Sequence, residues 1–340
     1  MKAAVLCGVK DIRLEDVEKP SISDREVLVK IKVALTCGTD AKVYQRGGHS
    51  KMLSVPSVFG HEWAGIVEEV GSHIKNFKKG DRVVAANSAP CFKCYYCKIN
   101  QFSLCEHLTF LNGAYAEYIK VPEAIVETNM FQIPADITYE EAAFLEPLSC
   151  VVHGVEEIGV KKGDKVVISG AGPIGLLFLI VLKNIGVKVI VTEKNEQRLQ
   201  VAETLGCDKG FLIKENDDFI IEVKRFFDKG ADIAIEATGI SKAWEDSVKM
   251  VRGGGRVLFF GGCKQVEKIE LDTELVHYSQ ITMKGVFHHT PAHVKKAYDL
   301  IIRKKLNLSR LITDKIPLDK VLDAFEKIIK GEGIKIAVIP

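Results

Sequence analysis

The chain has 340 residues, with 47 Lys and Arg residues against 45 Asp and Glu, and nine cysteines. This length indicates about two domains of ~150 residues and an ample core. The formal net charge is +2 and its charges are interspersed, without a basic face or tail. Nucleic acid is therefore not an expected partner, because phosphate binding requires clustered cations.

The apolar segments are too short for a membrane. The longest, residues 174–182, falls far below the ~20 residues that span a bilayer. The N-terminal apolar run is broken by Lys10 and Asp11, which argues against a signal peptide. We therefore expect a cytoplasmic protein with no membrane partner. In that reducing compartment, an odd number of cysteines indicates metal binding or burial rather than disulfides.

The elements expected along the chain change character near residue 150. Before it, short apolar runs such as 26–33 and 80–84, separated by Gly and Pro, predict a small β-barrel. After it, strands are expected at 165–169, 187–191, 232–237 and 256–260, with a helix over 174–185, a rhythm typical of a parallel α/β sheet. Near the C-terminus we expect an amphipathic helix over 318–329 and a strand over 334–339.

Four cysteines, Cys91, Cys94, Cys97 and Cys105, lie within fifteen residues. Such a set suits a closed tetrahedral Zn²⁺ site, because each thiolate donates charge to the metal and no position is left for water. Spacing alone also allows an iron–sulfur cluster or unliganded thiols. Structural zinc is the favoured interpretation.

Three shorter motifs contain residues that could act as ligands of a second metal ion and leave one of its coordination positions open. Cys37 opens Cys37-Gly38-Thr39-Asp40, His61 and Glu62 follow Gly60, and Glu146 precedes Pro147. Each alone is more often a packing or surface residue than a ligand. Pro147 fits the first position of a helix, which predicts Glu146 as its N-cap, and Cys150 is a rival ligand one turn later.

A dinucleotide signal follows the strand expected at 165–169. Gly170, Gly172 and Gly175, with Pro173 and Ile174 between them, open the next helix, so a pyrophosphate would sit at its N-terminus. Glu193 follows eighteen residues after Gly175, the right type and distance to bind the adenosine ribose hydroxyls. A carboxylate there favours NAD over NADP. The nearby Lys194 and Arg198 weaken that preference, and we count Arg198 among the expected coenzyme contacts.

Together these residues resemble the zinc-containing medium-chain dehydrogenase/reductase family over essentially the whole chain. Cys91 to Cys105 match its zinc-lobe pattern, Gly60-His61-Glu62 its G-H-E, and Cys37 to Asp40 its C-G-[ST]-D. Glu146-Pro147-Leu148 followed by His153 resembles the polyol (sorbitol) and threonine dehydrogenase branch. The resemblance implies a GroES-like β-barrel catalytic domain, residues 1–147 and 286–340, and a Rossmann NAD-binding domain with a doubly wound parallel sheet, residues 148–285.

The resemblance also implies roles for single residues. Cys37, His61 and Glu62 would hold a catalytic zinc, with Glu146 bound directly or through water and Cys150 a core thiol. With the cysteine lobe this makes two zinc ions per chain. Thr39 matches the hydroxyl of the family's proton relay. Phe110 and His288 fall near the substrate by rough position only.

The sequence departs from the family pattern in two places. Lys42 stands where both sorbitol and threonine dehydrogenases usually carry His, so that residue's role in proton relay or substrate binding cannot be carried over. The stretch from Cys105 to Tyr118 is short, which trims the substrate-pocket wall. Both departures concern the substrate, and neither concerns the metal or hydride chemistry.

The expected reaction is hydride transfer from a secondary alcohol, a polyol or related hydroxylated small molecule, to NAD⁺, with zinc as Lewis acid. L-threonine and simple secondary alcohols or diols are alternatives. A zinc-free quinone or enone reductase has no use for Cys37, His61 and Glu146 together. A non-catalytic NAD- and zinc-binding protein is the third hypothesis. The family resemblance implies a homo-oligomer, a dimer or tetramer, with pairing through the apolar segments 259–263 and 281–283.

Overall fold

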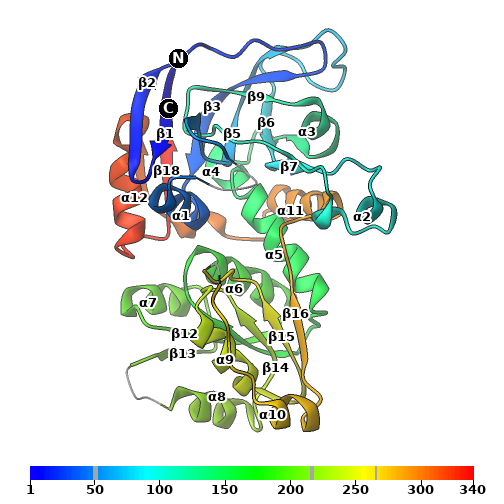
Figure 1. Cartoon of the computed structure of the whole chain (residues 1–340), viewed down its shortest axis with the longest axis vertical. Coiled ribbons are helices and arrows are strands. Elements are labelled where there is room, and N and C mark those ends of the chain that lie inside the picture. The colour runs from blue at the N-terminus through cyan, green and yellow to red at the C-terminus, as the bar shows by residue number, and fades with distance from the viewer. Residues whose placement is uncertain (49–52, 215–217, 265) are drawn as a thin grey trace. The chain divides into compact units, whose positions relative to one another are not determined.

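The computed structural model describes residues 1–48, 53–214, 218–264 and 266–340 (Figure 1). They form two compact units, one of Met1–Cys150 with His289–Pro340 and one of Val151–His288. The division falls inside helix α5, Leu145–Glu157. The first unit is thus built from both ends of the chain, and the second from the segment between them.

The first unit contains a three-stranded sheet in the order β2-β1-β4 and a seven-stranded sheet in the order β10-β6-β5-β3-β18-β17, with β9 also paired to β3. A further pair is β7 with β8. The strands are β1 Lys2–Gly8, β2 Asp11–Asp16, β3 Val27–Leu35, β4 Ser57–Val58, β5 Glu62–Val70, β6 Arg82–Ala85, β7 Ser88–Ala89, β8 Thr109–Phe110, β9 Tyr118–Val121, β10 Met130–Gln132, β17 Ile312–Pro317 and β18 Lys335–Ile339.

Short helices and 3-10 turns connect these strands. They are α1 Gly38–Arg46, α2 Tyr95–Lys98, η1 Phe102–Leu104, α3 Glu123–Thr128, α4 Tyr139–Ala142, α11 Pro291–Ile302, η2 Leu308–Leu311, η3 Leu318–Lys320 and α12 Val321–Ile329. The helix predicted over 318–329 begins as the 3-10 turn η3 and continues as α12. Apolar residues on one face of α12 explain why it packs on the barrel.

The two ends of the chain meet in one core. Phe325 of α12 stacks on Phe59, with ring centroids 5.4 Å apart, and lies edge-on to Tyr115 at 5.5 Å. All three side chains are buried. Strand β18 pairs antiparallel with β3, so that Val338 lies opposite Ala34. Burial of these large aromatic rings therefore joins the C-terminal segment to the N-terminal barrel.

The second unit is a six-stranded parallel sheet in the order β13-β12-β11-β14-β15-β16. This is the doubly wound order in which the direction of winding reverses between the two central strands, here β11 and β14. Its elements are β11 Lys165–Ser169, α6 Pro173–Ile185, β12 Lys188–Glu193, α7 Glu196–Thr204, β13 Lys209–Leu212, α8 Phe219–Phe227, β14 Ala231–Glu236, α9 Ser241–Met250, β15 Val251–Phe259, α10 Thr273–Tyr278 and β16 Thr282–Gly285.

Burial on both faces explains the apolar runs of this sheet. Ile168 of β11 lies between Val191 of β12 and Ile235 of β14, and all three are buried. The ring of Trp244 on α9 stacks on Phe259 of β15 at 4.0 Å between centroids. Helix α6 is buried from Gly175 to Leu182. No helix among the described residues is both long and apolar enough to span a bilayer.

Asp232 ties the amino-terminal edge of this sheet together, and its removal is expected to destabilise the unit at neutral pH. Its Oδ2 accepts a hydrogen bond from the Lys165 amide at 2.7 Å, and its Oδ1 accepts one from Nε of Arg252 at 2.6 Å. Partial burial opposes the charged form, but these two donors hold the pKa of Asp232 below its usual value.

Asp232→Asn should lower the free energy of unfolding at pH 7 by about 1–3 kcal/mol. A carboxyl group with a depressed pKa stabilises the fold above its unfolded-state pKa, about 4, and loses that contribution as pH falls through its folded pKa. The deficit should therefore shrink at pH 3, as measured by urea unfolding. Asp11→Asn, at an exposed pair with Arg13, is the control. An equal deficit at both pH values would contradict the assignment.

Candidate functional site

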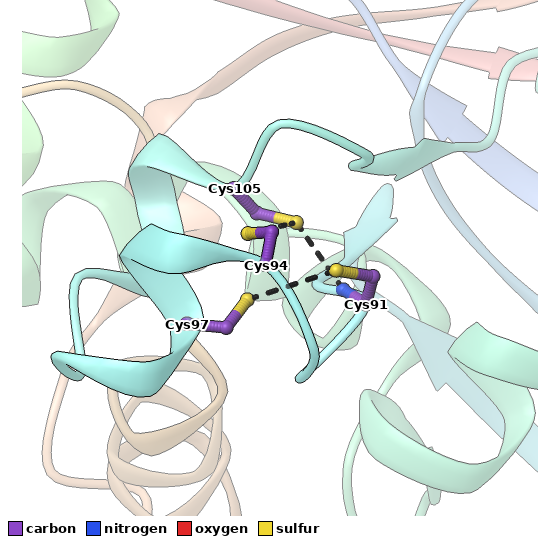
Figure 2. Close-up of side chains that lie close together, drawn as sticks. All are labelled: Cys91, Cys94, Cys97 and Cys105. Atoms are coloured by element: carbon purple, nitrogen blue, oxygen red, sulfur yellow. Dashed lines mark hydrogen bonds between the residues drawn. The ribbon is translucent and has the colours of Figure 1, made fainter.

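The four clustered cysteines converge on one point. Figure 2 shows their sulfur atoms turned toward one another, and all four lie within 4.8 Å. Cys91 precedes α2, Cys94 is its N-cap, Cys97 lies within it, and Cys105 follows η1. The Sγ atoms of Cys91 and Cys97 are 4.0 Å apart, and those of Cys94 and Cys105 are 3.8 Å apart.

These distances fit a single tetrahedral ion. A Zn–S bond of about 2.3 Å places the sulfur atoms of a tetrahedron about 3.8 Å apart. A cluster of several iron atoms would hold the sulfur atoms farther apart. The chain therefore presents a closed set of thiol ligands with the size that one zinc ion requires.

Backbone amides favour the thiolate form in this lobe. The Lys93 amide donates to Sγ of Cys91 at 3.5 Å, and the amides of Cys91 and His107 each donate to Sγ of Cys105 at 3.3 Å. The bond from Lys93, with that from Cys94, lowers the pKa of Cys91 to about 6. Burial raises the pKa of Cys97 to about 12. A bound cation would offset this second effect by stabilising the thiolate.

A second group forms where β3 ends and β5 begins. The antiparallel register sets Leu35 of β3 opposite Glu62 of β5, which brings Cys37 beside His61. Cys37, His61 and Glu62 each offer a ligand atom, and these atoms lie within 4.8 Å of one another. Cys37 is also the N-cap of α1, where its Sγ accepts a hydrogen bond from the Thr39 amide at 3.4 Å. Register and helix start together fix the position of the sulfur.

Buried partners fix the orientation of the His61 ring. Its Nδ1 lies 2.9 Å from Oδ1 of Asp40, and Tyr115 Oη donates to the other Asp40 oxygen at 2.7 Å. The three side chains are at most 5% exposed. When Nδ1 of His61 carries a proton and donates it in a hydrogen bond to Asp40, Nε2 is the atom available to a metal. Burial lowers the pKa of His61, but Asp40 and Cys37 together raise it well above its usual value.

Glu62 has a partner that sequence analysis missed. Both carboxylate oxygens accept hydrogen bonds from Nζ of Lys335, at the start of β18, and the pair is 0% and 1% exposed. Burial raises the pKa of Glu62 to about 7, against the opposing effect of the Lys335 charge. Strand β18 is held at this place by Thr36, whose amide donates to the Ile336 carbonyl at 3.0 Å. The C-terminal strand thus delivers a cation to the second group.

Glu146 does not cap its helix. The prediction of an N-cap is wrong, because α5 begins at Leu145, a fully buried residue, and Glu146 lies in the first turn. Its Oε1 accepts a hydrogen bond from Sγ of Cys150 at 3.6 Å. Burial raises the pKa of Glu146, while the charges of His61 and Lys335 lower it. Among the described residues, Glu146 lies outside the set of ligand atoms of Cys37, His61 and Glu62 that are within 4.8 Å of one another.

The remaining predicted residues lie in varied surroundings. Thr39 is half-buried in the first turn of α1, and Lys42 is exposed on the same helix. Phe110 is half-buried at the end of β8, while His288 belongs to the second unit. Their contacts with a substrate stay predictions. Asp40 stands within a recognised motif, but its role, like those of Tyr115 and Lys335, is visible only in the folded chain.

The glycine-rich turn of the second unit has the shape of a phosphate cradle. Gly172 is the N-cap of α6, Pro173 occupies the first turn, and a side chain at Gly172 would meet nothing within 4 Å. A Cβ on Gly175 would lie 1.9 Å from the Gly170 carbonyl, so only glycine permits this close approach of helix and strand. The open space at the helix N-terminus suits an anionic pyrophosphate.

A cavity of about 460 Å³ adjoins this turn. Glu193 is fixed at its edge, since one carboxylate oxygen accepts from the Ala171 amide at 2.6 Å and the other from the amides of Lys194 and Asn195 at 2.7 and 2.9 Å. Arg198, on α7, is not among the described residues that line the cavity. The lining residues are Ser169, Gly170, Thr192, Glu193, Lys194, Ile213, Lys214, Phe219, Thr238, Ile240, Lys242, Ala243 and Asp246.

Comparison with known families agrees with both units. A model of the alcohol dehydrogenase GroES-like domain matches residues 23–134, and a model of the zinc-binding dehydrogenases matches residues 173–303. Sorbitol dehydrogenase of Bacillus subtilis is 32% identical over 350 residues, covering 100% of this chain and 97% of that protein. L-threonine 3-dehydrogenase of Idiomarina loihiensis is 29% identical over 331 residues, covering 96% and 95%.

Comparison with solved structures also finds zinc-binding dehydrogenases. A candidate zinc-binding dehydrogenase from Sinorhizobium meliloti, bound to NADP, superposes with a TM-score of 0.92 at 28% identity and covers 100% of this chain and 99% of that one. The expected GroES-like and Rossmann folds and the family resemblance are confirmed. The chain belongs to the zinc-binding alcohol dehydrogenases of the medium-chain dehydrogenase/reductase family, oxidoreductases that act on CH–OH groups.

Proposed function

We propose that this chain reversibly oxidises a secondary alcohol group of a polyol, or of a related hydroxylated small molecule, to a ketone with NAD⁺. The observation that carries the proposal is the group formed by the half-buried Cys37 and the buried His61, with the His61 ring oriented by Asp40. Thiolate and imidazole are typical ligands of catalytic zinc, and a carboxylate behind the histidine is the usual support for such a ligand. The 32% identity to a sorbitol dehydrogenase points to a polyol.

Each nearby side chain has a defined task in this proposal. Bound zinc and NAD⁺ would supply, respectively, polarisation of the alcohol oxygen and acceptance of hydride. Cys37 and His61 hold the metal, and Asp40 keeps the ring proton on Nδ1 of His61. The Thr39 hydroxyl passes the alcohol proton toward solvent. Glu62 is the third ligand, and Glu146 binds directly or through water.

The coenzyme site favours NAD in this proposal. Glu193 lines the cavity with both carboxylate oxygens fixed by backbone amides, and a fixed negative charge repels a 2′-phosphate. Lys194, Lys214 and Lys242 line the same cavity and oppose that preference. Lys242 is already paired with Asp246 at 2.8 Å, so the carboxylate of Glu193 is expected to dominate.

Assembly and location complete the proposal. Strand β16 is one edge of the parallel sheet, and an edge strand offers unpaired backbone groups to a second copy. We propose a homo-oligomer joined there. Four clustered thiols fit a reducing compartment, which supports a cytoplasmic location.

A substrate panel tests the reaction. NADH formation would be measured at saturating NAD⁺ with sorbitol, xylitol, inositol, sugar acids, 2,3-butanediol, L-threonine and primary alcohols. We expect the highest kcat/KM with a polyol, and at least about tenfold preference for NAD⁺ over NADP⁺ (a difference of about 1.4 kcal/mol). Turnover of L-threonine alone, or of primary alcohols alone, would contradict the polyol assignment. A preference for NADP⁺ would contradict the role of Glu193.

Metal analysis tests the two zinc sites. We expect about two zinc ions per chain in the purified protein and about one in either Cys37→Ser or Cys97→Ser. Cys37→Ser should abolish turnover with little change in Tm, whereas Cys97→Ser should lower Tm because its lobe loses the ion that closes it. Cys7→Ser, outside both groups, is the control. Unchanged NAD-dependent turnover in Cys37→Ser would instead support a non-catalytic role.

Lys335 should be required for stability because it neutralises a buried carboxylate. Lys335→Met leaves the Glu62 carboxyl buried without its partner, so the group must either stay charged at a high desolvation cost or take up a proton, because its pKa rises further once the Lys335 charge is gone. We expect the free energy of unfolding of the metal-free protein to fall by about 3–5 kcal/mol. Lys315→Met breaks an exposed pair with Glu140 and should cost at most about 1 kcal/mol. Both are measured by denaturant unfolding. Equal losses in the two variants would show that the buried pair has no special role.

A further inference from the structure

Glu236 is a buried carboxylate that the proposed reaction does not use. It is the last residue of β14, one of the two strands between which the sheet reverses its winding, and it is 0% exposed. Its Oε1 accepts hydrogen bonds from the amides of Thr238 at 2.6 Å and Gly239 at 3.0 Å, and from the Thr238 hydroxyl. Burial raises the pKa of Glu236, and these donors oppose the rise by stabilising the charged form.

The same residue reaches a second turn. Its main-chain carbonyl accepts from the amides of Phe260 and Gly261, each at 3.0 Å, immediately after β15. The indole nitrogen of Trp244 donates to the Gly261 carbonyl at 3.0 Å. Glu236 is therefore bonded to the turns that follow two neighbouring strands of the sheet.

The two turns touch through their backbones. A Cβ on Gly239 would lie 2.4 Å from the Gly262 carbonyl oxygen, and a Cβ on Gly261 would lie 2.3 Å from the Gly239 nitrogen and 2.8 Å from Oε2 of Glu236. Neither position has room for a side chain. Movement of the turn after β14, which contains Gly239, would therefore displace the turn after β15, which contains Gly261.

The turn held by Glu236 forms part of the coenzyme cavity. Thr238 and Ile240 line the cavity of about 460 Å³ together with Gly170 and Glu193. Thr238 also packs on the glycine-rich turn before α6, since a Cβ on Gly170 would lie 2.6 Å from Cγ2 of Thr238. The position of Thr238 thus affects both the width of the cavity and the shape of the glycine-rich turn.

We propose that Glu236 is a positioning residue for the coenzyme: its carboxylate holds the Thr238–Gly239 turn in place and so preforms the cavity that receives the adenosine half of the dinucleotide. The inference rests on the proposed coenzyme role of this cavity. Glu236 acts through Thr238 rather than by touching the ligand. When the wall of the cavity is ordered before the ligand binds, less conformational entropy is lost on binding, and the affinity is higher.

The test measures equilibrium binding of AMP and of NADH to the full-length protein by calorimetry. Glu236→Met removes both carboxylate oxygens at similar side-chain volume, keeps the main-chain carbonyl that binds the second turn, and should weaken both ligands at least tenfold. Glu236→Gln keeps one acceptor oxygen for the turn, so its loss should be smaller. Thr238→Val removes the hydroxyl that donates to Glu236 and that accepts from the Ile240 amide at 3.1 Å. Because the amides of Thr238 and Gly239 still donate to Glu236, its loss should be smaller than that of Glu236→Met.

Asp232→Asn separates positioning from stability. Asp232 lies in the same strand, at its opposite end, and its variant should lose unfolding free energy yet bind AMP within twofold of the wild type. The inference is overturned if Glu236→Met folds and binds AMP within twofold, or if Asp232→Asn weakens AMP as much as Glu236→Met does. Where Glu236→Met does not fold, unchanged AMP affinity in Glu236→Gln and Thr238→Val overturns it. Failure of the wild type to bind AMP or NADH would contradict the coenzyme proposal instead.

Discussion

The buried carboxylate of Glu62 is the constraint on which the first unit depends. A charge removed from water costs several kcal/mol unless an opposite charge and hydrogen bonds accompany it. Lys335 supplies both, and it can do so only because β18 lies next to β3 in the sheet. The C-terminal strand is therefore part of the group around Cys37, His61 and Glu62 as well as of the barrel, and the core around Phe325 holds it there.

Buried polar side chains with hydrogen-bond partners also fix the other residues around Cys37 and His61. His61 is oriented by Asp40, and Asp40 is in turn held by Tyr115. Each carboxylate oxygen of Asp40 has its own partner, one in the His61 ring and one in the Tyr115 hydroxyl, and this restricts the direction in which the ring presents Nε2. The cysteine lobe is assembled differently: its four cysteines are close in the chain, and two short helical turns with backbone N–H donors are enough to gather them.

In the second unit, the described residues of the candidate site are positioned by close contacts between backbone segments and not by a buried pair of opposite charges. Gly175 lets α6 approach β11, and Gly239 and Gly261 let the turns after β14 and β15 touch. Glu236 and Glu193 are both carboxylates satisfied largely by backbone amides. Such amides are fixed by the turn itself, so the cavity between them has a defined shape before any ligand arrives.

Much of this could be predicted from sequence because its signals are local. The spacing of Cys91 to Cys105 already places four ligands on one short lobe, and the order of strand, glycine turn, helix and acidic residue predicts the parallel sheet and its ligand edge. The start of α5 does not follow from such local signals. Pro147 predicts that the helix begins at residue 147, but it begins at the buried Leu145. Lys335 stands 273 residues from Glu62, and no spacing rule joins residues so far apart. Only strand pairing in the folded chain decides which cation meets that carboxylate, because β18 lies beside β3 only after the two ends of the chain have come together. Likewise, only folding brings Asp40 of α1 next to His61.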